Sequence, residues 1–68
     1  MNELPSHLQD RVLSFPEYSQ GVNRIIVRLD DGREFSDVFV AWGTEIIKVE
    51  GHAVLPFDPS RIVEVKKQ

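Results

Sequence analysis

The chain of 68 residues predicts a small, mainly β fold: a five-stranded barrel with a short α-helix before it. Apolar residues alternate with period two from residue 22 onward, and glycine-containing turn signals interrupt them at short intervals. The length allows one domain, residues 1–68. Strands this short and few cannot form two packed sheets, but they can bend into a barrel that buries its inner face. An open, bent antiparallel meander with the helix across one face is the alternative.

Residues 3–16 predict the N-terminal helical segment. Ser6 and the glutamine three residues later have the spacing of a capping box, in which both side chains bond to backbone N–H groups. Leu8 and Val12 recur at helical spacing, and Pro16 disfavours helical geometry at the residue before it. Because so short a helix is marginal alone, we expect it to dock on the strands.

The remaining segment, residues 22–66, predicts the barrel, with strands at 22–29, 33–42, 44–50, 52–55 and 62–66. Between Phe35 and Val38 the apolar spacing changes from two to three, which predicts a bulge near Ser36 and Asp37. The expected core residues are Ile25, Val27, Leu29, Phe35, Val38, Val40, Ile47, Val49 and Val63.

Composition excludes several classes of function. The net charge is −3 with acidic and basic residues interspersed, which disfavours a nucleic-acid partner because such proteins usually present a basic face. The absence of cysteine excludes disulfides, thiolate metal sites and cysteine nucleophiles. The sequence shows neither a secretory signal nor an apolar run long enough for a membrane span, so we expect a cytoplasmic protein without a membrane partner.

Candidate catalytic groups are few. Ser60, His52 and Asp58 provide the residue types of a hydrolytic triad, but no glycine-flanked nucleophile turn surrounds the serine. Asp58 and Ser60 are better explained as turn residues. His7 and His52 without cysteine do not make a zinc ligand set. We therefore expect no enzyme, no cofactor and no metal.

The segment Val27–Phe35 resembles the strand–turn–strand of Sm-like proteins, which have small SH3-like barrels. The Sm family contacts RNA through an Asp, a hydrophobic residue and an Asn after its second strand. This chain has Ala-Trp-Gly-Thr there, residues 41–44, so the RNA pocket does not carry over. The resemblance implies a fold and no activity.

We expect a small non-catalytic interaction or regulatory module of the bacterial type, which binds a protein partner or a second copy of itself. Strand alternation places Ile26 and Phe39 on the face away from the core, where an exposed apolar patch marks a partner surface. The candidate binding residues are Ile26, Phe39, Trp42, Arg24 and Arg28. A helix packed over this patch is the competing interpretation.

The alternative function is binding of single-stranded RNA. It would use Arg24, Arg28 and Arg33 for the phosphates and Trp42 for base stacking. A salt-dependent response to single-stranded RNA distinguishes this function from binding of a protein partner.

Overall fold

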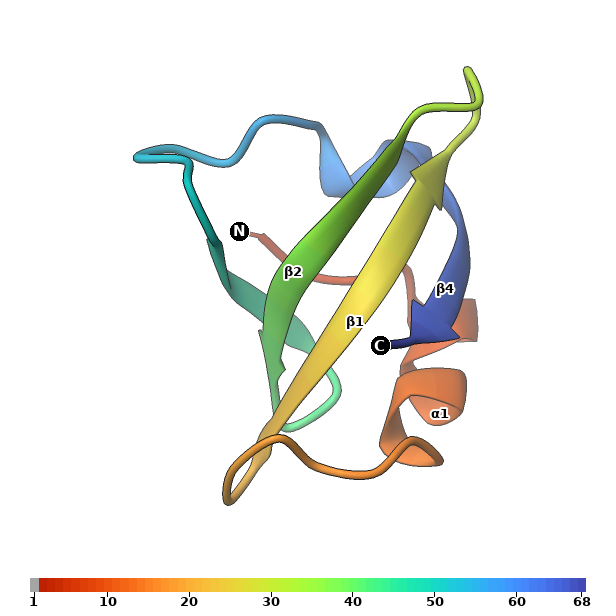
Figure 1. Ribbon diagram of the computed structural model, residues 1–68. Helices are drawn as coiled ribbons and strands as arrows, with labels where there is room; N and C mark the ends of the chain where they lie inside the picture. Colours follow the sequence, from red (N-terminus) through yellow and green to blue (C-terminus); the bar gives the residue numbers. More distant parts are fainter. Residues whose placement is uncertain (1) are drawn as a thin grey trace.

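The computed structural model describes residues 2–68 and shows one short helix and an open antiparallel sheet of four strands (Figure 1). The strand order is β3-β2-β1-β4, so the last strand returns to pair with the first. The elements are α1 (Ser6–Leu13), β1 (Val22–Leu29), β2 (Glu34–Ala41), β3 (Glu45–Val49), a 3₁₀ turn (Pro59–Arg61) and β4 (Ile62–Lys67).

The mainly β class and the N-terminal helix are confirmed, but the closed five-stranded barrel is wrong, since the sheet is open and has four strands. The strand predicted at residues 52–55 is a loop of turns and bends. Its place beside β3 is taken by the N-terminal segment. There the Leu4 N–H donates to the Thr44 carbonyl at 2.8 Å, and the Ile46 N–H donates to the Asn2 carbonyl at 2.8 Å. Residues 52–55 therefore cannot pair with this stretch of the β3 edge, because the N-terminal segment already does.

The bulge predicted in β2 is confirmed. Ile25 pairs with Val38 and Val27 pairs with Phe35, so two β2 residues, Ser36 and Asp37, lie opposite one β1 residue. Asp37 has a positive φ of 55°. An extra residue bends a strand and increases its twist, which contributes to the curvature of the sheet.

Two further bulges were not predicted, and they correct two core assignments. In β3, Ile46 pairs opposite Val40 whereas Lys48 pairs opposite Phe39, so Ile47 is the extra residue. Ile46 is consequently buried and Ile47 is exposed.

A bulge of the same kind occurs in β4, where Val63 is the extra residue between Ile62 and Glu64. Ile62 and Val65 point into the core, and Val63 is exposed. The predictions that Ile47 and Val63 are buried are therefore wrong, because a bulge shifts the alternation by one residue.

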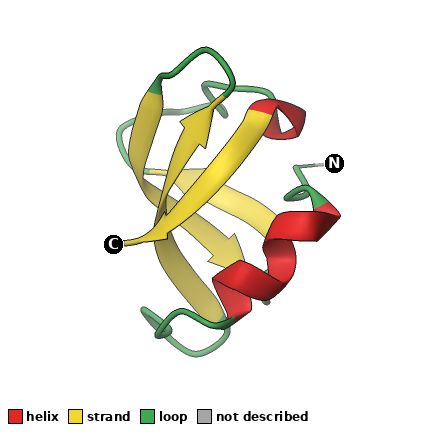
Figure 2. Ribbon diagram, turned by 90° about the vertical axis from the view of Figure 1, so that its right-hand side faces the viewer, coloured by secondary structure: helices red, strands yellow, loops and turns green. Residues whose placement is uncertain are grey.

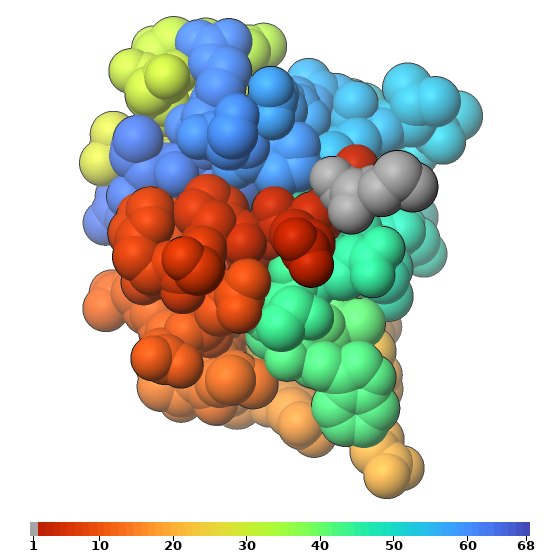
Figure 3. All heavy atoms as spheres, turned by 180° about the vertical axis from the view of Figure 1, so that it is seen from behind, coloured from red at the N-terminus to blue at the C-terminus, as the bar shows by residue number. Residues whose placement is uncertain are grey.

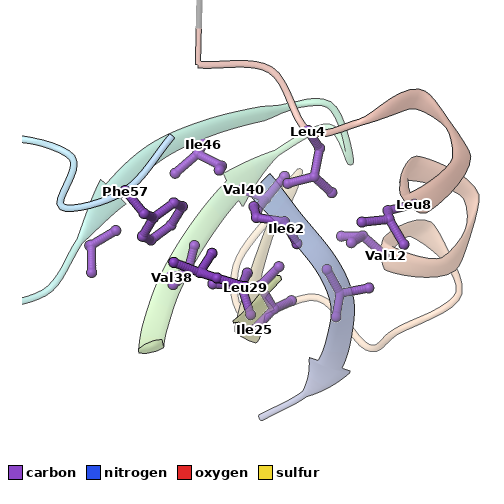
Figure 4. Packing of buried hydrophobic residues seen from close by; sticks show 13 residues of the cluster. Leu4, Leu8, Val12, Ile25, Leu29, Val38, Val40, Ile46, Phe57 and Ile62 are labelled. Atoms are coloured by element: carbon purple, nitrogen blue, oxygen red, sulfur yellow. The ribbon is translucent and has the colours of Figure 1, made fainter. Parts of the chain in front are cut away.

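The core lies between the inner face of the curved sheet and the helix. Leu8 and Val12 of α1 join the buried residues of all four strands (Figure 4), and α1 packs on β4 and β1. The expected residues of β1, together with Val38, Val40 and Val49, are buried, and Phe35 is partly buried. Since α1 packs on the inner face, as Figure 2 also shows, it does not cover the outer patch.

Helix α1 is shorter than the predicted segment 3–16, and the capping box does not form. Pro5 is the N-cap residue, and no side chain caps the helix start. The Gln9 side chain instead donates to the Leu4 carbonyl at 3.0 Å. After the helix, the buried Asn23 side chain donates to the Phe15 and Pro16 carbonyls at 3.3 and 3.2 Å, which fixes the connector to β1.

Candidate interaction surface

The structure places four of the predicted binding residues on the outer face of the sheet. Arg24, Ile26 and Arg28 lie along β1 on the side away from the core, and Phe39 of β2 lies directly opposite Arg24. Ile26 and Phe39 are half-buried. Trp42 is not on this face: it lies beyond the end of β2, in the turn to β3.

The charged side chains of the outer face neutralise one another. The Arg24 Nε lies 2.8 Å from a carboxylate oxygen of Asp37, and the Arg28 Nε lies 2.9 Å from one of Glu64. These hydrogen bonds from the guanidinium groups hold the pKa of Asp37 and the pKa of Glu64 below their ordinary values. Lys66 pairs in the same way with Glu34, at 2.9 Å.

The aromatic rings of the outer face contact each other and cationic side chains of the chain, although the Tyr18 side chain is 60% exposed. Tyr18 and Phe39 make an edge-to-face pair with ring centroids 5.2 Å apart. The Lys48 ammonium lies 5.3 Å from the Phe39 centroid, and the Arg24 guanidinium carbon lies 5.6 Å from the Tyr18 centroid. Long cationic side chains thus partly shield the apolar surface that the sequence predicts to be exposed here, above all at the half-buried Phe39.

Trp42 has a different environment. Its side chain is 68% exposed, and its φ is +56°, a left-handed conformation that bulky residues rarely adopt. The backbone N–H of Trp42 donates to the Gly21 carbonyl at 2.7 Å. This bond continues the β1–β2 pairing by one step and fixes the backbone at Trp42. The strained conformation is therefore held by the surrounding structure.

Two glycines shape the surface around Trp42. A Cβ atom at Gly21 would lie 2.5 Å from Cη2 of the indole, and one at Gly43 would lie 2.5 Å from Cγ of Leu13. The indole therefore rests on the Gly21 backbone, and the exposed Leu13 side chain rests on Gly43. We call Leu13, Gly21, Trp42 and Gly43 the Trp42 platform. In Figure 3 the β2–β3 turn (green) borders the C-terminal end of α1 (orange).

Leu13 was not among the predicted site residues. It falls outside the helical stripe of Leu8 and Val12, so sequence periodicity alone indicates a solvent-facing position. The signal that finds it is three-dimensional: Gly43 leaves room for Leu13 beside the turn that contains Trp42.

A second exposed apolar region lies at the β3 edge. Ile47 and Val54 are 55% and 78% exposed and border a groove of about 520 Å³ between β3 and the loop that follows it. The groove also contains the polar side chains of Asn2, Lys48 and His52. None of these residues has a positive φ, in contrast to Trp42.

Two of the residues considered for catalysis, Asp58 and Ser60, have a structural role. Asp58 accepts hydrogen bonds from the Ser60 N–H at 3.0 Å and from the Ser60 hydroxyl at 2.8 Å, which caps the 3₁₀ turn. These bonds hold the pKa of Asp58 below its ordinary value. Within residues 2–68, no three His, Asp or Glu side chains are arranged to hold a metal ion.

No helix in the described part of the chain, residues 2–68, is long and apolar enough to span a membrane. Comparison of the chain with protein-family models, with curated proteins and with solved structures found no match. The exposed surfaces themselves therefore provide the basis for a functional proposal.

Proposed function

We propose that the protein is a small, non-catalytic interaction module that binds a protein partner through the Trp42 platform. The observation that carries this proposal is the exposed indole of Trp42, held at positive φ on Gly21. A left-handed conformation at a residue with a Cβ costs about 1–3 kcal/mol, and exposed apolar surface adds no stability in return. Glycine or asparagine would suit this turn better.

Tryptophan is also the residue type most typical of the energetic centre of protein interfaces. A large, rigid indole loses little conformational entropy when a partner covers it. The exposed Leu13, which lies on the next residue of the turn, Gly43, adds apolar surface to the same platform. These properties favour a protein surface as the ligand.

The outer face supports the alternative, single-stranded RNA, less well. Tyr18 and Phe39 with Arg24 do combine aromatic rings with a cation, as stacking surfaces for RNA bases do. However, Arg24, Arg28 and Arg33 pair with Asp37, Glu64 and Asp31. A phosphate would have to displace these carboxylates, and Trp42 is not on the face that bears Arg24 and Arg28.

Affinity purification from the native cell tests the proposal, with the wild-type protein, Trp42→Asn and Val54→Ser as baits. Asparagine tolerates positive φ, so Trp42→Asn removes the indole without straining the turn. Val54→Ser is the matched control, because it removes another exposed apolar side chain. We expect a nuclease-resistant protein partner to be retained by the wild type and by Val54→Ser and to be lost with Trp42→Asn.

Retention of the same partner by Trp42→Asn would contradict the proposal. Sedimentation of the wild type and Trp42→Asn shows whether the partner is a second copy: a dimer that dissociates in the variant identifies self-association through the platform. A salt-dependent fluorescence shift with single-stranded RNA would favour the alternative function.

A further inference from the structure

Within residues 2–68, a lysine or arginine side chain lies against most of the aromatic rings but not against Trp42. The chain contains four phenylalanines, one tyrosine and one tryptophan. Phe57 is buried, and four other rings carry a cationic group of the chain within 6 Å of the centroid. These pairs are Arg11–Phe15, Arg24–Tyr18, Arg33–Phe35 and Lys48–Phe39. Among residues 2–68, no cation or second ring lies against the indole, although indole attracts cations most strongly.

Charge is distributed unevenly around the molecule. Six of the eight lysines and arginines form ion pairs with acidic side chains. Within residues 2–68, the acidic side chains outside such pairs are Glu3, Asp10, Glu17, Glu45 and Asp58. All of these except Asp58 belong to the elements that form or flank the Trp42 platform.

Two of these carboxylates have a defined relation to the platform. Asp10 lies three residues before Leu13 on α1, so both occupy neighbouring positions on the helix surface. Glu45 follows Trp42 by three residues and lies opposite Glu3 in a β-bridge, which places two like charges together. Neither residues 12–23 nor residues 40–47 contain a lysine, arginine or histidine, and the side chain of Arg11, next to Asp10 in the sequence, donates to the Val65 carbonyl of β4. The C-terminal end of α1, beside Leu13, adds partial negative charge.

We propose that the Trp42 platform binds a basic peptide segment of the protein partner, with an arginine or lysine side chain over the exposed indole. The aliphatic part of that side chain lies against Leu13, and the carboxylates of Asp10 and Glu45 attract further cations of the segment. This inference rests on the proposed function, because it specifies the partner of the same surface. The uncompensated carboxylates also disfavour a phosphate-bearing ligand here.

Trp42 is the only tryptophan of the chain, so its fluorescence reports on the proposed site directly. The probes are two capped pentapeptides, acetyl-Gly-Arg-Leu-Arg-Gly-amide and its charge-reversed counterpart acetyl-Gly-Glu-Leu-Glu-Gly-amide. We expect the arginine peptide to change the emission saturably, with an affinity about tenfold or more above that of the glutamate peptide. Added salt should weaken the binding.

Charge-neutralising variants locate the interaction. Asp10→Asn and Glu45→Gln should each weaken binding of the arginine peptide by about two- to fivefold. Glu50→Gln is the matched control: it removes the same charge from a carboxylate that pairs with Lys48, and it should leave the affinity unchanged.

Equal binding of both peptides, no saturable change, or an equal loss of affinity in Glu50→Gln and Asp10→Asn would overturn the inference. The inference can also fail while the proposed function stands. If the wild type retains a partner that Trp42→Asn loses, while Asp10→Asn and Glu45→Gln retain it fully, the platform is an interaction site but its ligand is not basic.

Discussion

The outer face of the sheet and the Trp42 platform both present aromatic side chains, but they differ in what surrounds them. On the outer face, Tyr18 and Phe39 contact each other and lie under Arg24 and Lys48. At the platform, Trp42 is 68% exposed and contacts the backbone of a glycine. Tyr18 is 60% exposed as well, but its ring has an aromatic and a cationic partner within the chain, whereas the described residues provide neither for the indole.

This difference separates two reasons for a surface aromatic residue. A ring with neighbours within its own chain contributes to stability, because its burial and its cation contacts are realised on folding. A ring that is held at a strained position and left exposed gains its main contacts only when a partner arrives. Substitutions on the outer face should therefore affect stability, and substitution of Trp42 should affect binding.

We expect the largest loss of stability from a substitution at Gly21, on which the indole of Trp42 rests. Gly21→Ala should lower the free energy of unfolding by about 1–3 kcal/mol, because Gly21 has φ +74° and the new methyl group displaces the indole. Urea unfolding measures the loss. Gly51→Ala is the control, since Gly51 has φ +85° but no atom within 4 Å of the added Cβ. Only Gly21→Ala should also change the Trp42 emission of the folded protein; equal spectra in both variants would show that the indole does not rest on Gly21.

Phe39→Ala should destabilise the fold by about 1–2 kcal/mol, since the half-buried ring loses its contacts with Tyr18 and Lys48. Thermal unfolding followed by circular dichroism measures this loss. Binding to the arginine peptide should remain at the wild-type affinity below the melting transition. A variant of unchanged stability that no longer binds would reverse the roles assigned to the two surfaces.

Trp42→Asn should show the opposite behaviour. Its free energy of unfolding should stay within about 1 kcal/mol of the wild type, because relief of the positive-φ strain offsets the lost contact with Gly21. Capture of the partner should be abolished. Loss of several kcal/mol of stability in this variant would show that Trp42 belongs to the core-supporting structure.

The smallest effect is the loss of stability in acid, to which the carboxylates of the outer face contribute. Hydrogen bonds from Arg24 and Gln68 lower the pKa of Asp37 from its ordinary value of 3.8, and a bond from Arg28 lowers that of Glu64 from 4.5. A depressed pKa stabilises the fold above the unfolded-state value, and that contribution is lost as the pH falls through the folded-state value. Unfolding free energy should thus decrease below about pH 4.5.

Asp37→Asn is the matched variant for this prediction, since asparagine also tolerates the positive φ at this position. Urea titrations from neutral to acid pH should show a shallower decrease in stability for Asp37→Asn than for the wild type. Identical pH profiles would mean that the Arg24–Asp37 pair contributes nothing to stability.

Besides the alternation of apolar residues, the sequence contains spacings of three that mark the bulges of this sheet. The spacing of three between Phe35 and Val38 correctly predicted a bulge in β2. Ile46 and Val49 have the same spacing, as do Ile62 and Val65, and each pair is buried across a bulge. A strict period of two wrongly predicted that Ile47 and Val63 lie in the core. A strand with an extra residue cannot be distinguished by composition from a regular strand.

The candidate site was harder to predict from the sequence than the fold. The sequence predicted Trp42 as a binding residue together with Arg24 and Phe39, but the structure places it beyond the end of β2 and away from their face. The contacts of Leu13 with Gly43 and of Trp42 with Gly21 join positions far apart in the chain. Local patterns do not specify such contacts, since they depend on how α1 and the connector close over the end of the sheet.

The N-terminal segment has a consequence for how the protein folds. Asn2 and Leu4 pair with the outer edge of β3, and the Arg11 side chain donates to the carbonyl of Val65 in β4, 54 positions later. Covering the β3 edge therefore requires residues 2–4 to meet β3, and the contact of α1 with β4 joins positions still farther apart in the chain. Contacts between such distant positions slow folding, and uncovered edges favour pairing with other chains in the meantime. We therefore expect the docking of the N-terminal segment and α1 onto the strands to be among the slow steps of folding.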